Sequence, residues 1–338
     1  MHDLIVVGAG PAGLATALYS ARAGLDTVVI ESRPSPIDKA CGEGLMPGAV
    51  ACLRELGVPL DGHPLRGIRY TDGHCRAEAV FRDGHGLGVR RTDLQAALQS
   101  EVVTRGVPVL QRRVSEITQD ARCVTAAGAT ARYLVAADGL HSAIRRQLGL
   151  DRPPSGHHRW GLRRHFEVAP WTDFVEVHWA RDREAYVTPV GPRLVGVALL
   201  SATRGSFARQ LAEFPALAQR LPDTAATAVR GAGPMRQDAR ARVAGRVLLV
   251  GDAAGYVDAI TGEGIDVALK CARALVQCLE CGQPARYERA WSRASRRSRL
   301  LTSSLLWARR QPRLGPVIVP LAARSPRLFA AAVHQVAR

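Results

Sequence analysis

The feature that most constrains the fold is a glycine pattern close to the N-terminus. Gly8-x-Gly10-x-x-Gly13 overlaps the end of an apolar, β-branched run, DLIVVGAG, which predicts a buried strand. The next residues, PAGLATALYSARAG, have helical periodicity and stop at Gly24, a common C-terminal position of helices. A second strand-like run, DTVVIE, follows. A strand–helix–strand unit of this kind implies a parallel sheet with a right-handed crossover.

The same glycines predict a nucleotide-binding turn. Gly8 permits the tight turn, Gly10 lets a pyrophosphate approach the backbone, and Gly13 lets the helix pack closely on the strand. The N-terminus of the helix then presents amide groups and a positive dipole end to the phosphates. We predict phosphate contacts along the turn and the first helical residues, at Gly8, Gly10, Pro11, Ala12 and Gly13.

An acidic residue ends the second predicted strand. Glu31 lies 23 residues after Gly8, where an acid binds the ribose hydroxyls of a dinucleotide. We assign the next two residues, Ser32 and Arg33, to the same cofactor contact. A carboxylate at this position disfavours a 2′-phosphate, so the motif alone indicates NAD or FAD.

The charge of the chain is strongly positive, at +16 for pH 7. Lys39 and Lys270 are the only lysines, so nearly all of the excess is arginine, which indicates a compositional bias. Basic segments are not interleaved with aromatic residues as a base-stacking surface requires, so we predict no nucleic-acid partner. Affinity for anionic surfaces or substrates is compatible with this charge.

The cysteines indicate a reduced, cytoplasmic protein. Seven of them are scattered without the spacing of a disulfide framework. Cys278 and Cys281 have CxxC spacing, but they lie in a helical pattern without a second pair, so we expect a buried structural role and no metal site. No apolar run is long enough to predict a membrane-spanning helix.

Two later segments separate NAD from FAD. One has the pattern D-G-x-x-S-x-x-R from Asp138 to Arg145, and the other, GRVLLVGDAAGYVDAITGEGI, has Gly251-Asp252 at the end of a strand. Together with GAGPAG, and in this order, they resemble the superfamily of flavoprotein aromatic hydroxylases and geranylgeranyl reductases, which share the p-hydroxybenzoate hydroxylase-like fold. The resemblance covers about residues 1–280 and implies FAD as the cofactor.

The resemblance implies an interrupted domain organisation, which agrees with the strand-like runs at 154–200 and the return of an α/β pattern near residue 246. We predict an α/β fold in which a Rossmann-type FAD-binding domain is interrupted by a mostly antiparallel substrate-domain sheet, with a C-terminal helical tail. The predicted ranges are 1–66, 92–153 and 236–285 for the FAD-binding domain, 67–91 and 154–235 for the substrate domain, and 286–338 for the tail.

The resemblance also assigns residues to the flavin half of FAD. In that family the aspartate of the Gly-Asp pair hydrogen-bonds the ribityl chain, which would be Asp252 here. The residues that follow place the flavin ring at a helix N-terminus, whose dipole favours the negative charge of a reduced flavin. They match Gly262, Gly264 and Ile265.

Two further positions have open alternatives. Arg91, at the start of the RTDL helix, is either a cofactor contact or a solvated helix-start residue. Asp138 and Gly139 lie either near the cofactor, where the family sometimes links them to pyridine-nucleotide use, or in a structural turn. No second glycine-rich dinucleotide motif occurs, so the family resemblance implies NADPH or NADH as a transient electron donor.

The segment DKACGEGLMPGAV, residues 38–50, indicates a branch of the family. Hydroxylases often carry an arginine here beside the flavin, whereas the geranylgeranyl reductase-like branch has a C-G-x-G motif, which this segment resembles. Two departures oppose that branch. Ala259 stands where the reductases usually have proline, and their aromatic Y-x-W-x-F-P segment is reduced to AYVTPVG, with Tyr186 and Pro189.

The catalytic candidates lie in the same segment. Cys41 and Gly42 are predicted to line the flavin, because a nucleophilic Cys41 would need an activating base and none is identifiable nearby in sequence. A direct chemical role for Cys41 is the alternative. Glu43, if desolvated beside the flavin, would donate or accept a proton, and a loop carboxylate paired with an arginine is its alternative.

Substrate contacts are predicted from the second sheet and the late segment. His165, Tyr186 and Tyr256 are candidates to face the substrate, and a satisfied structural residue is the alternative for each. The arginine-rich tail is either an amphipathic surface that contacts anionic lipid peripherally while a lipophilic substrate enters, or a helical cap packed on the core.

These observations predict an FAD-dependent oxidoreductase with a lipophilic small-molecule substrate. The leading hypothesis is an NAD(P)H-dependent monooxygenase that hydroxylates a lipophilic or aromatic, polyketide-like compound through a flavin hydroperoxide. The alternative is a flavin-dependent reductase of carbon–carbon double bonds in an isoprenoid or polyketide-like chain. A non-catalytic FAD-fold binding protein is the third hypothesis, and the intact phosphate, ribose and ribityl motifs oppose it.

Overall fold

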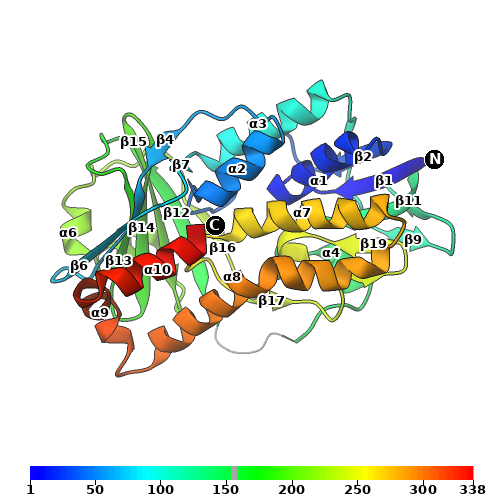
Figure 1. The fold of residues 1–338 in the computed structure, drawn as a ribbon. Coiled ribbons are helices and arrows are strands. Elements are labelled where there is room, and N and C mark those ends of the chain that lie inside the picture. Colours follow the sequence, from blue (N-terminus) through cyan, green and yellow to red (C-terminus); the bar gives the residue numbers. More distant parts are fainter. Residues whose placement is uncertain (154–157, 338) are drawn as a thin grey trace.

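Two large sheets form the two ends of the molecule (Figure 1). The first has eight strands: β1 (His2–Val7), β2 (Thr27–Glu31), β8 (Val109–Gln111), β9 (Ile117–Gln119), β10 (Val124–Ala126), β11 (Ala129–Ala136), β18 (Val243–Ala244) and β19 (Val247–Leu249). In the computed structural model, which describes residues 1–153 and 158–337, β8, β2, β1, β11 and β19 are adjacent and parallel in that order. This is the order of dinucleotide-binding folds, in which ligands bind beyond the carboxyl ends of the strands.

The second large sheet has seven strands and is mostly antiparallel. They are β5 (Gly67–Thr71), β6 (Arg76–Val80), β12 (Trp160–Phe166), β13 (Phe174–Trp179), β14 (Arg183–Gly191), β15 (Leu194–Ser201) and β16 (Arg230–Ala232). Their order is β16–β12–β15–β14–β13–β5–β6, in which β13 and β5 form the parallel pair. Buried and half-buried residues alternate along most of β12, which is the two-residue period of a strand with one face in the core.

Two small sheets complete the strand pairing. They consist of β3 (Gly44–Leu45), β4 (His63–Leu65) and β7 (Gly86–Gly88) in one sheet, and β17 (Gln237–Asp238) and β20 (Gly255–Tyr256) in the other. The three-stranded sheet joins two strands from the predicted cofactor range 1–66 to one from the predicted substrate range 67–91.

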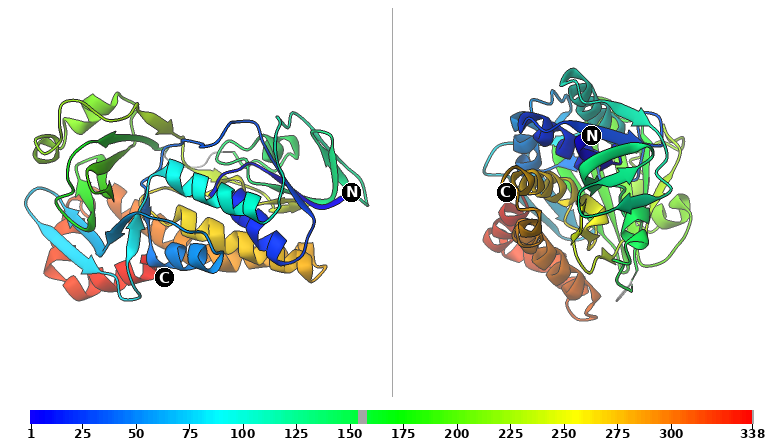
Figure 2. Two further views of the ribbon diagram at one scale, coloured as in Figure 1. Left: turned by 90° about the horizontal axis from the view of Figure 1, so that it is seen from above. Right: turned by 90° about the vertical axis from the view of Figure 1, so that its right-hand side faces the viewer.

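The helices pack on the sheets and on one another. Their bounds are α1 (Pro11–Arg22), α2 (Pro47–Glu55), α3 (Arg91–Thr104), α4 (Ala143–Gln147), α5 (Phe207–Leu211), α6 (Pro215–Ala218), α7 (Gly264–Glu280), α8 (Tyr287–Arg310), α9 (Ile318–Arg324) and α10 (Pro326–Ala337), with short 3-10 turns η1 (Gly251–Ala253), η2 (Pro284–Arg286) and η3 (Gly315–Val317). Helix α1 packs between α3 and α7, and α8 packs along α7. Helices α9 and α10 then cover β6 of the second sheet, and Figure 2 shows α8–α10 gathered on one side of the molecule.

The predicted α/β class, with its parallel sheet, mostly antiparallel second sheet and C-terminal helical region, is confirmed. The domain ranges stay predictions. The predicted boundary after residue 153 adjoins residues 154–157, and both these residues and the last residue of the predicted tail, Arg338, lie outside the described residues.

Candidate active site

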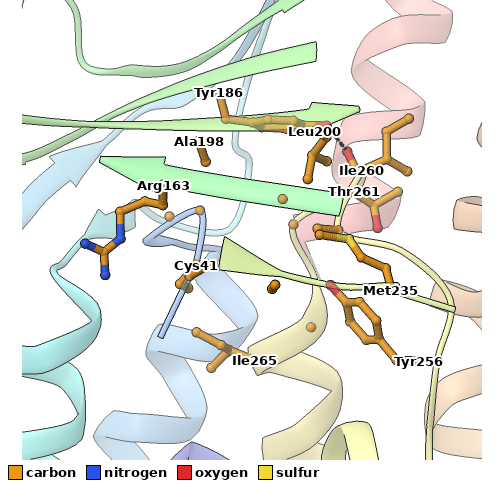
Figure 3. Close-up of a pocket in the computed structure, with 18 of the residues that line it drawn as sticks. Cys41, Arg163, Tyr186, Ala198, Leu200, Met235, Tyr256, Ile260, Thr261 and Ile265 are labelled. Atoms are coloured by element: carbon orange, nitrogen blue, oxygen red, sulfur yellow. Dashed lines mark hydrogen bonds between the residues drawn. The ribbon is translucent and has the colours of Figure 1, made fainter. Parts of the chain in front are cut away.

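A cavity of about 1000 Å³ lies between the two large sheets and is closed on one side by the C-terminal helices. One end is formed by the glycine turn and the residues after β11 and β19, including Gly10, Asp138 and Asp252. The other end is lined by aliphatic and aromatic side chains from the second sheet and from α8–α10. Figure 3 shows Cys41 and Ile265 on one side of this space, with Tyr186 and Leu200 of the sheet across from them.

Each glycine of the turn is a glycine for a different reason. Gly8 has a φ of +107°, and a Cβ there would lie 2.5 Å from the carbonyl oxygen of Ala137. A Cβ on Gly13 would lie 1.9 Å from the carbonyl oxygen of Gly8, so these two residues are glycines because the protein itself leaves no room. A Cβ on Gly10 would meet only Arg91, at 3.7 Å, because Gly10 faces the cavity.

The first residues of α1 are placed as predicted beside this turn. Pro11 occupies the first helical position, where its missing N–H costs nothing, and Pro11 and Ala12 line the cavity. Gly8 and Gly13 lie behind the turn and shape it without lining the cavity. The turn therefore presents Gly10, Pro11 and Ala12 to a ligand, which is the arrangement a pyrophosphate requires.

Arg91 carries a buried charge next to the turn. Its side chain is about 6% exposed, it lines the cavity, and its Nη1 has no hydrogen-bond partner among the described residues. Burial lowers the pKa of Arg91, although Cys41, Asp252 and Glu43 offset part of that effect. A buried guanidinium with an unused donor that faces a phosphate-binding turn fits an anionic ligand such as a pyrophosphate.

Glu31 is held by the turn itself. Its carboxylate accepts hydrogen bonds from the Ala9 amide at 3.0 Å, the Ser32 amide at 2.9 Å, and both the amide and the side chain of Arg33. Burial raises the pKa of Glu31, but the hydrogen bonds from Arg33 and Ala9 outweigh it and lower the pKa to about 2. The carboxylate is therefore ionised at neutral pH and sits at the end of β2, and its contact with a ribose stays a prediction together with those of Ser32 and Arg33.

The two later motifs meet in space through Arg145. Ser142 caps α4 by accepting a hydrogen bond from the Arg145 amide. The buried Arg145 guanidinium pairs with Asp151 and donates to the carbonyl oxygen of Ala253 at 3.0 Å. The D-G-x-x-S-x-x-R segment thus holds the turn that carries Asp252.

Asp252 and Asp138 both face the cavity. Burial raises the pKa of Asp252, and the nearby charges of Lys39 and Arg91 lower it in part. Asp138 accepts a hydrogen bond from the Ile144 amide through Oδ2, while its buried Oδ1 has no partner among the described residues. Both side chains therefore have acceptor capacity that a hydroxyl-bearing ligand would use.

The N-terminus of α7 borders the same cavity. Gly262, Gly264 and Ile265 line it, and Gly262 has a φ of +71°, which favours glycine. The residues present fit FAD: Gly10 and Arg91 would hold its phosphates, Asp252 its ribityl hydroxyls, and these glycines would leave room for a flat ring at the positive end of the helix dipole.

Cys41 and Gly42 line the cavity in the loop between β2 and β3. Burial raises the pKa of the Cys41 thiol, and Arg91 lowers it only in part, so the thiol keeps its proton at neutral pH. This matches the prediction of a small lining residue better than that of an activated nucleophile. The Gly42 carbonyl accepts a hydrogen bond from Thr188 of β14 at 2.8 Å, which fastens the loop to the second sheet.

Glu43 is buried, although it lines the cavity, and its φ of +60° is unusual for a residue with a side chain. Its Oε1 accepts from the Arg91 amide at 2.8 Å, and its Oε2 lies 2.7 Å from Nε2 of His165. Arg163 Nε lies 3.7 Å from Oε1, and Nη2 of the same guanidinium pairs with Asp38. This arrangement matches the alternative expected for Glu43, a loop carboxylate paired with an arginine. The structure adds His165 and the Arg91 amide, which make it a buried network.

His165 does not line the cavity, because its side chain is about 1% exposed and lies behind Glu43. Arg163 has donors only and its Nη1 lies 3.2 Å from Nδ1 of His165, so the ring proton belongs on Nε2, where it is donated to Glu43. The expectation that His165 contacts substrate is corrected: it holds Glu43 in place. Tyr186 and Tyr256 do line the cavity, and the Tyr186 hydroxyl donates to the carbonyl oxygen of Ile260 at 2.8 Å.

Three other residues near the cofactor site escaped the sequence analysis. Lys39 and Arg163 line the cavity, and Gln95 is fully buried between the glycine turn and the loop before Lys39. Lys39 lies in the segment DKACGEGLMPGAV, two residues before Cys41, and that position could have identified it as a candidate. Arg163 and Gln95 had none, because their roles depend on contacts across two sheets and a helix.

Glu263, just before α7, gives a pH-dependent prediction. Its side chain is buried, and burial raises its pKa to about 7, although hydrogen bonds with Ser298 and Thr261 lower it in part. A raised pKa in the folded state means that this group favours folding most at low pH, and that the contribution is lost as the pH rises through about 7. We expect Glu263→Gln, which resembles the protonated form, to be more stable than the natural protein by about 2 kcal/mol at alkaline pH.

Thermal unfolding of the two proteins across the pH range measures this difference. The gap between their midpoints should shrink steadily toward acid pH. A gap that stays constant with pH would show that the substitution acts through packing and not through the carboxylate.

The comparison with known proteins agrees with this geometry. A family model described as "FAD binding domain" matches residues 1–282. The menaquinone reductase of Mycobacterium tuberculosis (strain H37Rv) is 31% identical, in an alignment that covers 98% of this chain and 90% of the relative. The digeranylgeranylglycerophospholipid reductase 1 of Methanopyrus kandleri is 28% identical over 80% of this chain and 78% of its own length.

A solved structure, a flavoprotein/dehydrogenase from Cytophaga hutchinsonii, superposes with a TM-score of 0.86 over 98% of this chain and 92% of its own. At 19% identity, that likeness shows the fold. The resemblance seen in the sequence motifs is thus confirmed by the family model. This chain belongs to the family of proteins with this FAD-binding domain, and it is an FAD-dependent oxidoreductase.

Proposed function

We propose that this protein is a reductase that saturates a carbon–carbon double bond in the isoprenoid chain of a lipid. The observation that carries the proposal is the apolar end of the cavity. Every lining residue contributed by α8, α9 and α10 is apolar, among them Leu301, Leu305, Ile318, Phe329, Val333 and Val336. A cavity wall of this kind, continuous with the flavin-binding end, suits a long hydrocarbon chain.

The names of two relatives support the same substrate class. Menaquinone and geranylgeranyl lipids share one chemical feature, an unsaturated isoprenoid chain. The missing aromatic segment opposed this reading of the sequence. The apolar lining from the C-terminal helices offers another way to hold such a chain, because aliphatic side chains bury hydrocarbon as aromatic ones do.

The chain's own residues would bind the cofactor, orient the substrate and supply a proton to its double bond. When bound, FAD would supply hydride chemistry, with NADPH or NADH as the proposed source of electrons. Arg91 and Asp252 would anchor the cofactor, and the apolar wall would exclude water. Saturation also needs a proton at carbon. The Cys41 thiol and the Tyr256 phenol in the cavity wall are our candidates for its source, and burial raises the pKa of each, so both hold their protons at neutral pH.

The experiment supplies the FAD-loaded protein with reduced nicotinamide and a prenylated quinone or a geranylgeranyl lipid, with and without oxygen, and follows the products by mass spectrometry. We expect a gain of two hydrogen atoms in the isoprenoid chain, without any need for oxygen. Fragmentation must locate the gain in the chain, because reduction of a quinone ring to a quinol adds the same mass. Product carrying one added oxygen atom, formed only in air, would overturn the proposal in favour of hydroxylation. A protein that takes up no FAD would overturn both.

The substitution Tyr256→Phe tests the proton source within the same assay. It removes the hydroxyl and keeps the ring that lines the cavity. We expect turnover to fall by about a hundredfold to a thousandfold while FAD binding is retained, which is within the range for loss of a general acid. Cys41→Ser keeps a small hydroxyl in the same wall and is the matched comparison. Unchanged turnover in Tyr256→Phe would exclude the Tyr256 phenol as the proton donor.

A further inference from the structure

Large apolar side chains are exposed on the C-terminal helices. They are Leu300 (57%), Trp307 (60%), Leu314 (40%), Val317 (44%), Leu321 (60%) and Leu328 (71%). None of them lines the cavity, so they face the outside of the protein. We call these six residues the apolar tail surface.

Arginines accompany this surface and acidic residues do not. From residue 289 to residue 338 the sequence has eleven arginines and no aspartate or glutamate. On α8, Arg296, Leu300, Trp307 and Arg310 are exposed. Their spacing of three, four or seven residues places them on one face of the helix. The opposite face of α8, including the buried Trp291, packs into the protein.

The same pattern continues along α9 and α10. Leu321 and Arg324 are exposed one turn apart on α9, and Leu328 is exposed near the start of α10. The buried residues Val319 and Phe329 point the other way, into the core of the second sheet. The C-terminal helices therefore form a single layer with the cavity on one side and the apolar tail surface on the other.

The C-terminal helices combine exposed apolar side chains with arginines, as interfacial helices do. Among the described residues no single helix is long and apolar enough to cross one, and the pair 315–324 and 326–337 passes that test only together and is bent by 107°. Tryptophan favours the headgroup level of a bilayer, and arginine pairs with lipid phosphates. An amphipathic helix with these two features binds in the plane of an anionic interface.

We propose that the apolar tail surface docks on an anionic phospholipid bilayer, so that a lipid substrate reaches the cavity past α8–α10 without crossing water. The entry route rests on the proposed function, whereas the docking does not. A nucleic acid would match the arginines but leave the exposed tryptophan and leucines unused. The absence of acidic residues from 289 onward favours a negatively charged partner over a second copy of this basic chain.

The test measures binding of the FAD-loaded full chain to vesicles, without substrate. We expect at least about tenfold tighter association with vesicles that contain phosphatidylglycerol than with pure phosphatidylcholine vesicles, and weakening with added salt. Of the five tryptophans in the sequence, Trp307 is the exposed one. Its fluorescence should therefore be quenched by lipids brominated on their acyl chains. The quenching should disappear in Trp307→Phe.

A triple variant, Trp307→Ser with Leu321→Ser and Leu328→Ser, should lose about tenfold or more of the vesicle binding. Val103→Ser is the control, because Val103 is 59% exposed on α3, a helix that lies at the top of Figure 1, away from α8–α10. FAD absorbance and the thermal midpoint report whether each variant is folded. Equal vesicle binding by the triple variant and the control would overturn the proposal.

Two further outcomes decide between occupants. In the first, the natural protein binds no vesicles and forms a dimer in light scattering that the triple variant does not form. That result would identify a second copy of this chain as the occupant of the apolar tail surface and overturn the membrane-docking proposal. Vesicle binding by a protein that reduces no isoprenoid lipid would support the docking and reject the proposed reaction.

Discussion

Replacing Gly13 with alanine is expected to abolish FAD binding and to destabilise the protein without its cofactor. A Cβ at this position would lie 1.9 Å from the carbonyl oxygen of Gly8, which is backbone and cannot move aside as a flexible side chain does. The helix must therefore shift away from β1, which opens the turn that presents its amides to the phosphates. We expect at least about a hundredfold loss of FAD affinity, equivalent to about 2.8 kcal/mol.

The matched variant Gly10→Ala separates the two effects. A Cβ on Gly10 would lie in ordinary contact with Arg91, at 3.7 Å, so the fold has room for it, but it would project where a pyrophosphate approaches. Titration of the apoproteins with FAD, followed by flavin fluorescence, gives the affinities, and thermal unfolding of the apoproteins gives the stabilities. Gly10→Ala should weaken FAD binding and keep the midpoint, whereas Gly13→Ala should lower both. Normal FAD binding by Gly13→Ala would refute the role given to the turn.

Local sequence patterns predicted the cofactor side of the molecule well. Apolar, β-branched runs mark β1 and β2, and helical periodicity marks α1. Gly13 has a steric reason close in sequence, the carbonyl of Gly8, whereas Gly8 is constrained by the distant Ala137. The late Gly-Asp motif was also readable. Its connection to the D-G-x-x-S-x-x-R segment through Arg145 was not, because that contact spans 108 residues.

The substrate side was less predictable for a physical reason. A strand directs its side chains alternately to two faces, and a single sequence does not tell which face meets the cavity. His165 and Tyr186 therefore appeared as equal candidates, although one lies behind Glu43 and the other lines the cavity. The parallel pairing of β5 with β13 joins segments about a hundred residues apart and leaves no local mark.

The substitution Glu43→Ala is expected to be the most damaging single change outside the glycine turn. It removes the acceptor of two buried donors, the Arg91 amide and Nε2 of His165, and a carboxylate near Arg163. Leaving buried donors unpaired costs about 1–3 kcal/mol each, so we expect a loss of about 3–5 kcal/mol in the free energy of unfolding. The loop between β2 and β3 would also lose its connection to α3 and β12. Because this loop lines the cavity that fits FAD, flavin affinity should fall with stability.

Two other substitutions at this position separate the side chain from the backbone. Glu43→Gln keeps one acceptor oxygen but must direct its amide NH₂ at either the Arg91 N–H or the His165 N–H, so it should cost about half as much as alanine. Glu43→Gly removes the side chain but relieves the φ of +60°, and should be less damaging than alanine by about 1 kcal/mol. The order of stability is therefore natural protein, Gln, Gly, Ala, measured by urea unfolding of the FAD-free forms.

The partly exposed ion pair of Glu101, whose side chain is 15% exposed, with Arg105 provides the control for Glu43. The two residues are one helical turn apart, and Arg105 is 35% exposed, so Glu101→Ala should cost about 0.5 kcal/mol or less. A double-mutant cycle of Glu43→Ala with His165→Ala should then yield a coupling of about 1–3 kcal/mol, since the two side chains bond each other directly. If Glu43→Ala were as mild as Glu101→Ala, the buried network would not hold the cofactor loop. A large loss together with a strong coupling means that the C-G-E-G segment owes its glutamate to structure.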